Sequence, residues 1–228
     1  DRTVEGTLGI RTRNPVNILG PIVNSSPWIQ DRPVARFRTS QHPGYAAFAA
    51  ANASRARLLW VGAGDGMLHA FNATSGAPVM SYVPEALTPR LSSLTSQASV
   101  TAFVDGNAFT ADVNVAAPAS APDWRTYAFG TLGRGGRGVF ALDATNTATL
   151  DAAGTTGNAA SIFRWQFTAD DDADLGYVLS DVSISAGTGQ AAPIVKLQDG
   201  RFAMVFGNGT GSTNNRAALF ILPVEGPN

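Results

Sequence analysis

The densest group of side chains capable of chemistry is an acidic run near the start of the last quarter of the sequence. Asp170, Asp172 and Asp174 stand at positions 1, 3 and 5 of a D-x-D-x-D loop, and Asp181 falls at position 12. Loops that bind calcium place their carboxylate oxygens at these positions. The run departs from that loop at Leu175, where the sharp turn favours Gly, and at Asp181, where a bidentate Glu is usual. A calcium site and a solvated acidic turn are both open interpretations.

Histidine and glycine offer further candidates, but neither type has the context that its chemistry needs. His69 stands in an apolar segment, which predicts a hydrogen-bonded core residue, and His42 is expected in a distant exposed turn, so the two do not predict a zinc site. The glycine-dense run 130–138 lies between two expected strands, so it predicts a wide hairpin and not a phosphate-binding loop. The Ser, His and Asp residues show no spacing that predicts a catalytic triad.

Composition narrows the class of protein. The 228 residues are 44% hydrophobic and 14% charged, and the absence of Cys excludes thiol catalysis and cysteine-bound zinc. A formal net charge of −1 argues against nucleic acid as a partner. The most apolar stretch, 45–51, is too short to span a bilayer, so no membrane-spanning helix is expected.

A repeated pattern of strands and turns predicts the fold. The unit 57–76 reads as a strand, a Gly-Asp-Gly turn and a second strand, and the same order returns at 124–143 and 202–222. Further strands are expected before or after these hairpins at 21–30, 78–83, 108–115, 162–167 and 192–197. Four antiparallel strands recurring about every 70 residues describe propeller blades with insertions.

We therefore expect an all-β, quinoprotein-like β-propeller, incomplete in this chain, with about three four-stranded antiparallel blades. The expected domain is 1–228, a fragment of a larger multi-domain protein, with blade-like units at about 20–84, 100–168 and 177–223. The third unit is expected to lack its outer strand. Short helical insertions are predicted at 85–94 and 45–55, and a long exposed loop at 145–160.

Several motifs in order resemble one known family. They are Ile-Val-Asn-Ser-Ser-Pro at 22–27, Val-Gly-Ala-Gly-Asp-Gly-Met-Leu-His-Ala-Phe at 61–71, Phe-Val-Asp-Gly at 103–106, the run 130–143, and Asp-Leu-Gly-Tyr at 174–177 leading to Phe-Gly-Asn-Gly at 206–209. Together they resemble the C-terminal propeller of PilY/PilC-type proteins, the tip-associated adhesins of type IV pili. The resemblance covers roughly residues 18–223, with departures at Pro21 and Gly64.

The resemblance implies a non-enzymatic, exported protein that supports pilus assembly, balances retraction and takes part in surface adhesion. It implies a location at the pilus tip, the outer membrane or the cell surface, with the periplasm in transit. The implied partners are minor pilins of the tip complex, the remaining propeller blades and, through other domains, a host or abiotic surface. The family's calcium loop is expected outside this chain, which leaves Asp170, Asp172 and Asp174 as the Ca²⁺ candidates within it.

Two other classes of protein share the expected fold. A quinoprotein dehydrogenase repeats A-x-D-x-x-T-G-x-x-x-W, and the segment 70–76 follows this loosely, but Met80 stands at the Trp position that docks one blade on the next. A structural propeller serving as an interaction platform in another envelope complex would show every fold-level feature. Only the family-specific motifs separate the pilus interpretation from the platform.

Overall fold

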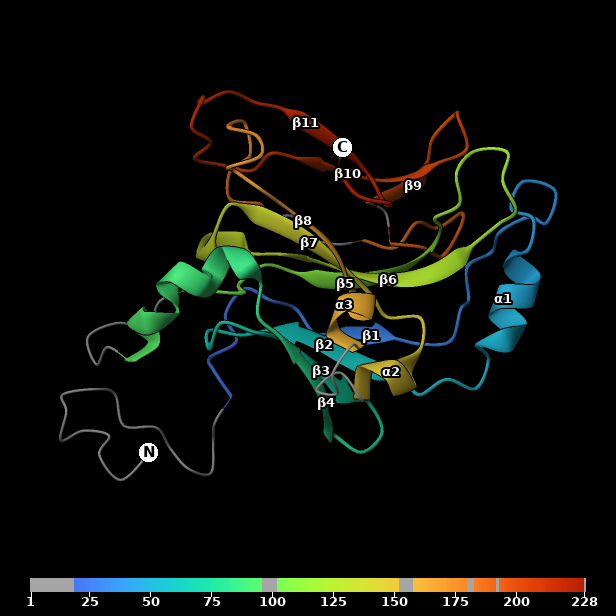
Figure 1. Cartoon of the computed structure of the whole chain (residues 1–228), viewed down its shortest axis with the longest axis horizontal. Coiled ribbons are helices and arrows are strands. Elements are labelled where there is room, and N and C mark those ends of the chain that lie inside the picture. The colour runs from blue at the N-terminus through green and yellow to red at the C-terminus, as the bar shows by residue number, and fades with distance from the viewer. Residues whose placement is uncertain (1–18, 96–101, 152–157, 180–182, 192, 228) are drawn as a thin grey trace.

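The chain folds into three antiparallel sheets. The computed structural model describes residues 19–95, 102–151, 158–179, 183–191 and 193–227. Strands dominate these residues, helices are short, and none of the described helices is long and apolar enough to cross a bilayer. The expectation of an all-β fold is confirmed (Figure 1).

The first two sheets are four-stranded meanders in which each strand pairs with its neighbour in the sequence. The first has the order β1-β2-β3-β4 and comprises Trp28–Gln30, Leu58–Gly62, Leu68–Asn72 and Pro78–Tyr82. The second has the order β5-β6-β7-β8 and comprises Ala108–Asn114, Trp124–Thr131, Gly138–Asp143 and Phe163–Thr168. The tight turn between β2 and β3 needs positive φ, which Gly66 supplies at 93°.

The third sheet contains three strands in the described residues. They are β9, Ile194–Lys196, β10, Phe202–Gly207, and β11, Leu219–Pro223, in the order β11-β10-β9. Strand β11 therefore stands at an edge of its sheet. The loop between β10 and β11 is tied to the chain upstream, because Tyr177 and Thr210 form an antiparallel bridge.

The three sheets stack face to face, with the second sheet in the middle (Figure 1). One apolar cluster, including Trp60 and Phe140, fills the space between the first and second sheets. Another, including Phe129, Phe167 and Phe220, fills the space between the second and third. Apolar side chains on both faces of the middle sheet thus pack against the two neighbouring sheets. The burial of this apolar surface is the main contribution to the stability of the stack.

The helical segments lie between strands, and one sequence-based expectation about them is wrong. Helix α1, Tyr45–Ala51, and the 3-10 helix η2, Glu85–Thr95, fall where the sequence predicts helices. The segment 145–160 is not a plain exposed loop, since it contains α2, Thr147–Asp151, and the start of α3, Asn158–Ile162. Leu150 is fully buried between them and the first two sheets, which supplies the apolar contact that the polar composition of this segment concealed.

The strand expected at 21–30 begins later than predicted. Only Trp28–Gln30 pairs in the sheet, because the backbone before it bonds to side chains of the second unit. The N–H of Asn24 donates to Asp105 at 3.2 Å, and the N–H of Ser26 donates to Asn107 at 2.8 Å. These polar groups therefore hold the first and second units together instead of extending β1.

The glycine-dense run between β6 and β7 holds the short 3-10 helix η3, Gly133–Gly135, against another segment. A Cβ at Gly135 would lie 1.5 Å from the carbonyl oxygen of Phe103, so any side chain would push two backbones apart. Glycine here permits a close backbone approach and does not cradle a phosphate.

We expect Gly135→Ala to lower the free energy of unfolding by about 3 kcal/mol, because the added methyl group meets backbone atoms. The matched control is Gly207→Ala in β10, where a Cβ meets nothing within 4 Å, and its expected effect is within about 1 kcal/mol. Denaturant unfolding of the chain and both variants measures the difference. Equal stability of the two variants would contradict the tight approach at Gly135.

Candidate functional site

The acidic run follows strand β8, and its carboxylates have separate partners. Asp174 accepts from Arg216 at 2.8 Å and from the Nδ2 of Asn214 at 2.7 Å. Asp172 accepts the N–H of Asp174 at 2.8 Å, which closes the turn locally. The hydrogen bonds and charge of Arg216 hold the pKa of Asp174 below its usual range, so this carboxylate is already neutralised by a cation from the β10–β11 loop.

This arrangement does not form a cage for calcium as it stands. Among the residues that the structure describes, no group of three or more His, Cys, Asp or Glu side chains is placed to hold a metal ion. Asp181, the expected ligand at position 12, lies outside the described residues. Calcium ligation by Asp170, Asp172 and Asp174 stays a prediction that requires Arg216 to release Asp174.

The structure brings together an Asp, a His and a Ser whose spacing in the sequence does not predict a contact. His69 on β3 has Nε2 3.0 Å from Oδ2 of Asp65 and Nδ1 2.9 Å from Oγ of Ser81 on β4. Asp65 also accepts the N–H groups of Gly20, at 2.9 Å, and Met67, at 3.2 Å. Because the carboxylate holds two backbone segments as well as the imidazole, we interpret the group as a clamp that fastens residue 20 to the β2–β3 turn.

A buried carboxylate lies at the centre of a second polar network. Asp112 on β5 is only 5% exposed, and it accepts from the hydroxyl groups of Tyr45, at 2.7 Å, and Thr126, at 2.6 Å. Arg55 donates to the same Thr126 at 2.7 Å. Burial raises the pKa of Asp112, and this outweighs the lowering by Thr126, Tyr45 and Arg55.

The network reaches from helix α1 to the third unit. The side chain of Gln190 accepts the N–H of Asp112 at 3.1 Å and donates to its carbonyl oxygen at 2.5 Å. Tyr45 in turn accepts the N–H of Ala35 at 3.0 Å. Asp112 therefore ties three parts of the chain together, and its carboxylate already has two hydroxyl partners.

The third sheet presents an apolar face to solvent. Leu219 and Ile221 on β11 are 67% and 51% exposed, while their neighbour Phe220 is buried against the second sheet. Val195 on β9 is exposed on the same side. An exposed apolar face beside an edge strand with unpaired backbone groups is a surface suited to binding another chain segment.

Stacked four-stranded antiparallel meanders define the class of protein, a β-propeller, of which this chain forms consecutive blades. The family model of the PilY1 beta-propeller domain matches residues 19–227, so the chain belongs to the PilY1 family. The resemblance read from the sequence motifs is confirmed.

Relatives agree with this assignment. The chain is 35% identical to a type IV pilus biogenesis factor PilY1 homolog of Xylella fastidiosa, over 97% of the chain and 17% of that protein. It is 33% identical to type IV pilus biogenesis factor PilY1 of Pseudomonas aeruginosa strain PAK, over 99% of the chain and 18% of that protein. The crystal structure of the Pseudomonas aeruginosa PilY1 C-terminal domain matches with a TM-score of 0.62 and 30% identity, over 86% of this chain and 34% of that one. The chain thus spans less than a fifth of the length of these two relatives.

We expect Tyr45→Phe to lower the free energy of unfolding by about 2–4 kcal/mol. The change leaves a buried oxygen of Asp112 and the N–H of Ala35 without their partner. Thermal unfolding measures the loss, and Tyr177→Phe is the matched control, because the Tyr177 hydroxyl makes no hydrogen bond within the described residues and its side chain is 38% exposed. An unchanged melting temperature for Tyr45→Phe would show that the network does not hold α1.

The variant Asp65→Asn tests the clamp through the pH dependence of the free energy of unfolding. Burial pushes the pKa of Asp65 upward, but the hydrogen bonds from His69 and the N–H of Gly20 outweigh it, and the net pKa is lowered. A carboxyl group with a lowered folded-state pKa stabilises the fold above its unfolded-state pKa of about 3.9, and this contribution is lost as pH falls through the folded-state pKa.

We therefore expect Asp65→Asn to lower the free energy of unfolding by about 1–3 kcal/mol at pH 7, with the difference narrowing below about pH 4. Urea unfolding at a series of pH values measures it. The exposed Asp170→Asn serves as the control and should show no such pH-dependent difference. A difference that stays constant down to pH 2 would argue against the ionised carboxylate as the stabilising partner.

Proposed function

We propose that the chain is a binding propeller within a longer type IV pilus biogenesis factor, which supports pilus assembly, counters retraction and contributes to adhesion. The observation that carries the proposal is the family match over residues 19–227. The polar clusters support binding over catalysis, since Asp65 and Asp112 both hold distant parts of the chain together. For this reason we propose a non-enzymatic function.

The exposed face of the third sheet supports a role for further blades as partners. Leu219 and Ile221 stand on a face that, in the first two sheets, is covered by the next sheet in the stack. The matched relatives are more than five times as long as this chain, and the matched C-terminal domain is about two and a half times as long, which leaves ample length for such blades. In this proposal the remaining blades cover Leu219 and Ile221.

Minor pilins of the tip complex are the proposed external partners, and other domains contact a host or abiotic surface. The proposed location is outside the cytoplasm, at the pilus tip, the outer membrane or the cell surface, with passage through the periplasm. The relatives are type IV pilus biogenesis factors, which supports a location on the pilus or in the cell envelope. We also propose that calcium binds the family's loop, which is expected outside this chain. Asp170, Asp172 and Asp174 are the secondary candidate ligands.

Shear fractionation of the source bacterium tests the proposal. An antibody raised against this chain should detect a band much larger than 23.6 kDa that co-purifies with sheared pili. Deleting the gene should remove surface pili, because assembly loses its support. Deleting the retraction motor as well should restore pili, because a factor that counters retraction is then no longer needed.

The matched control is the same double deletion complemented with the intact gene, which should show pili of unchanged amount. A band confined to the periplasm, near the size of this chain and absent from pili, would contradict the proposal. So would normal piliation in the single deletion strain.

A further inference from the structure

The segment that connects β1 to β2 carries an exposed row of arginines. From residue 31 to residue 38 the chain forms neither helix nor strand, and partly buried residues alternate with exposed ones, as in an extended segment. Ala35 and Phe37 face inward, while Arg32, Arg36 and Arg38 are exposed. We call these three residues the arginine stripe.

The inward side of this segment is fastened at several points. The N–H of Ala35 donates to the Tyr45 hydroxyl, and the ring of Phe37 stacks on His42 with centroids 4.3 Å apart. The N–H of Arg36 donates to the carbonyl oxygen of Thr188 at 2.7 Å, which ties the segment to the third unit. The backbone beneath the arginine stripe is thus held in place before any ligand binds.

The arginine stripe differs from most arginines of this chain in having no partner for its charge. Within the described residues, the guanidinium groups of Arg32, Arg36 and Arg38 make no hydrogen bond or ion pair. Five other arginines pair with carboxylates: Arg57 with Asp31, Arg125 with Asp123, Arg164 with Asp143, Arg201 with Asp199 and Arg216 with Asp174. Unneutralised positive charge is therefore concentrated on one rigid segment of a chain whose net charge is −1.

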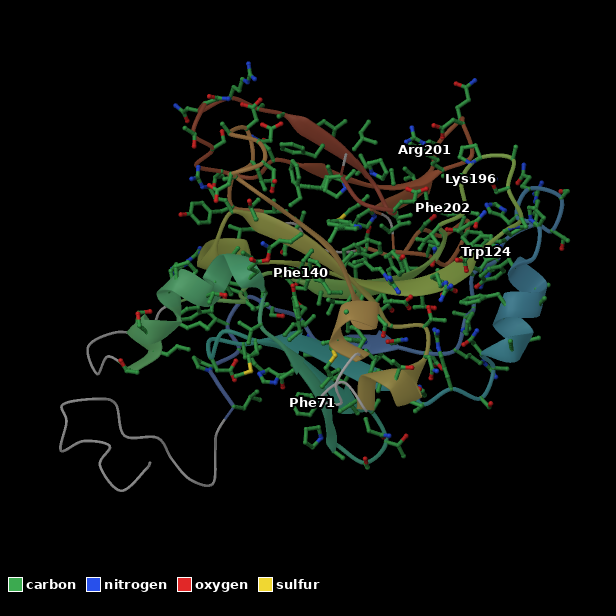
Figure 2. The ribbon with its side chains drawn as sticks, in the orientation of Figure 1. Phe71, Trp124, Phe140, Lys196, Arg201 and Phe202 are labelled. Carbon is green, nitrogen blue, oxygen red and sulfur yellow. The ribbon has the colours of Figure 1, made fainter. Side chains whose placement is uncertain are left out.

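A groove of about 430 Å³ opens beside the stripe. Its lining includes His42, Ile184, Val195 and Lys196. Lys196 and Phe202, a further lining residue, lie together at the end of the third sheet nearest Trp124 (Figure 2). Burial and the charge of Lys196 lower the pKa of His42, in keeping with a positive potential here.

Apolar groups accompany this positive charge. Ile184 and Val34 are 54% and 59% exposed, and Val34 stands between Arg32 and Arg36. A ligand that only carried negative charge would leave these apolar side chains in water. A ligand suited to this surface therefore carries both negative charges and apolar groups.

We propose that the arginine stripe and its groove bind an extended acidic peptide segment of a separate protein. Alternate residues of an extended chain lie about 6.6–6.8 Å apart, so a peptide with carboxylates at every second position matches the spacing of Arg36 and Arg38. Arginine pairs with carboxylates through two parallel hydrogen bonds, which favours this match. The apolar side chains between the carboxylates project to the other side of the peptide, where the groove residue Ile184 can contact them. The inference rests on this surface alone and does not depend on the pilus assignment.

Fluorescence anisotropy with a labelled peptide of alternating Glu and Val residues tests the proposal on the full chain. We expect saturable binding that weakens as salt is raised, because exposed charges are screened. Arg36→Glu with Arg38→Glu should weaken binding by about tenfold or more, since two attractive contacts become repulsive. A peptide with Lys in place of Glu should not bind.

The matched control is Arg134→Glu, an exposed arginine that also lacks a partner within the described residues but lines a different cavity, beside Asn24 and Asp105. It makes the same kind of charge change and should leave peptide affinity unchanged. Circular dichroism and thermal unfolding should show all variants folded, because none of these side chains makes a contact that folding needs. Arg36→Gln with Arg38→Gln provides a milder pair that should still weaken binding.

Three outcomes would overturn the proposal. One is the absence of saturable peptide binding. Another is an equal loss of affinity in Arg134→Glu, which would indicate a general charge effect. The third is binding of alginate, an anionic polysaccharide, without binding of the peptide, which would assign the stripe to a different class of ligand.

Discussion

The burial of both faces of the second sheet is the constraint on which the rest of the structure depends. Phe129 faces the third sheet and Phe140 faces the first, so each face needs a neighbouring sheet to exclude water. Gly130 makes this packing possible, because a Cβ there would lie 2.3 Å from the ring of Phe140. A single sheet of this composition would expose large aromatic rings, and the stack of three is the arrangement that covers them.

Local pattern was enough to predict most of the strands. Strands β2, β3, β6, β7 and β10 begin and end close to the apolar runs that predicted them, since hairpins are fixed by turn residues and by alternation over a few positions. The late start of β1 and the helices within 145–160 could not be read in this way. Both depend on contacts with distant parts of the chain, such as Asn24 with Asp105, 81 residues apart.

The polar side chains were harder to predict than the fold. A sequence shows that Asp65 and Ser81 are present, but only the pairing of β3 with β4 brings Ser81 to His69. For Asp112 one signal was available, a carboxylate between apolar residues of a strand, which indicates a buried charge with dedicated partners. The acidic run at 170–174 predicts a calcium site because its carboxylates are close in the sequence. Closeness in the sequence does not by itself direct several carboxylates at one ion.

The long connection between β1 and β2 also affects the order in which the chain can fold. Lys196 donates to the carbonyl oxygen of Gln41 across 155 residues, and the N–H of Arg36 donates to the carbonyl oxygen of Thr188, so this loop finds these partners only in the third unit. Contacts so far apart in sequence slow folding, because a long stretch of chain must be ordered before they form. In a chain that emerges N-terminus first, the β1–β2 connection would lack these hydrogen bonds until the third sheet had folded. The segment would thus stay open to proteases until the third sheet had formed, and its protection would report that the first three sheets had assembled.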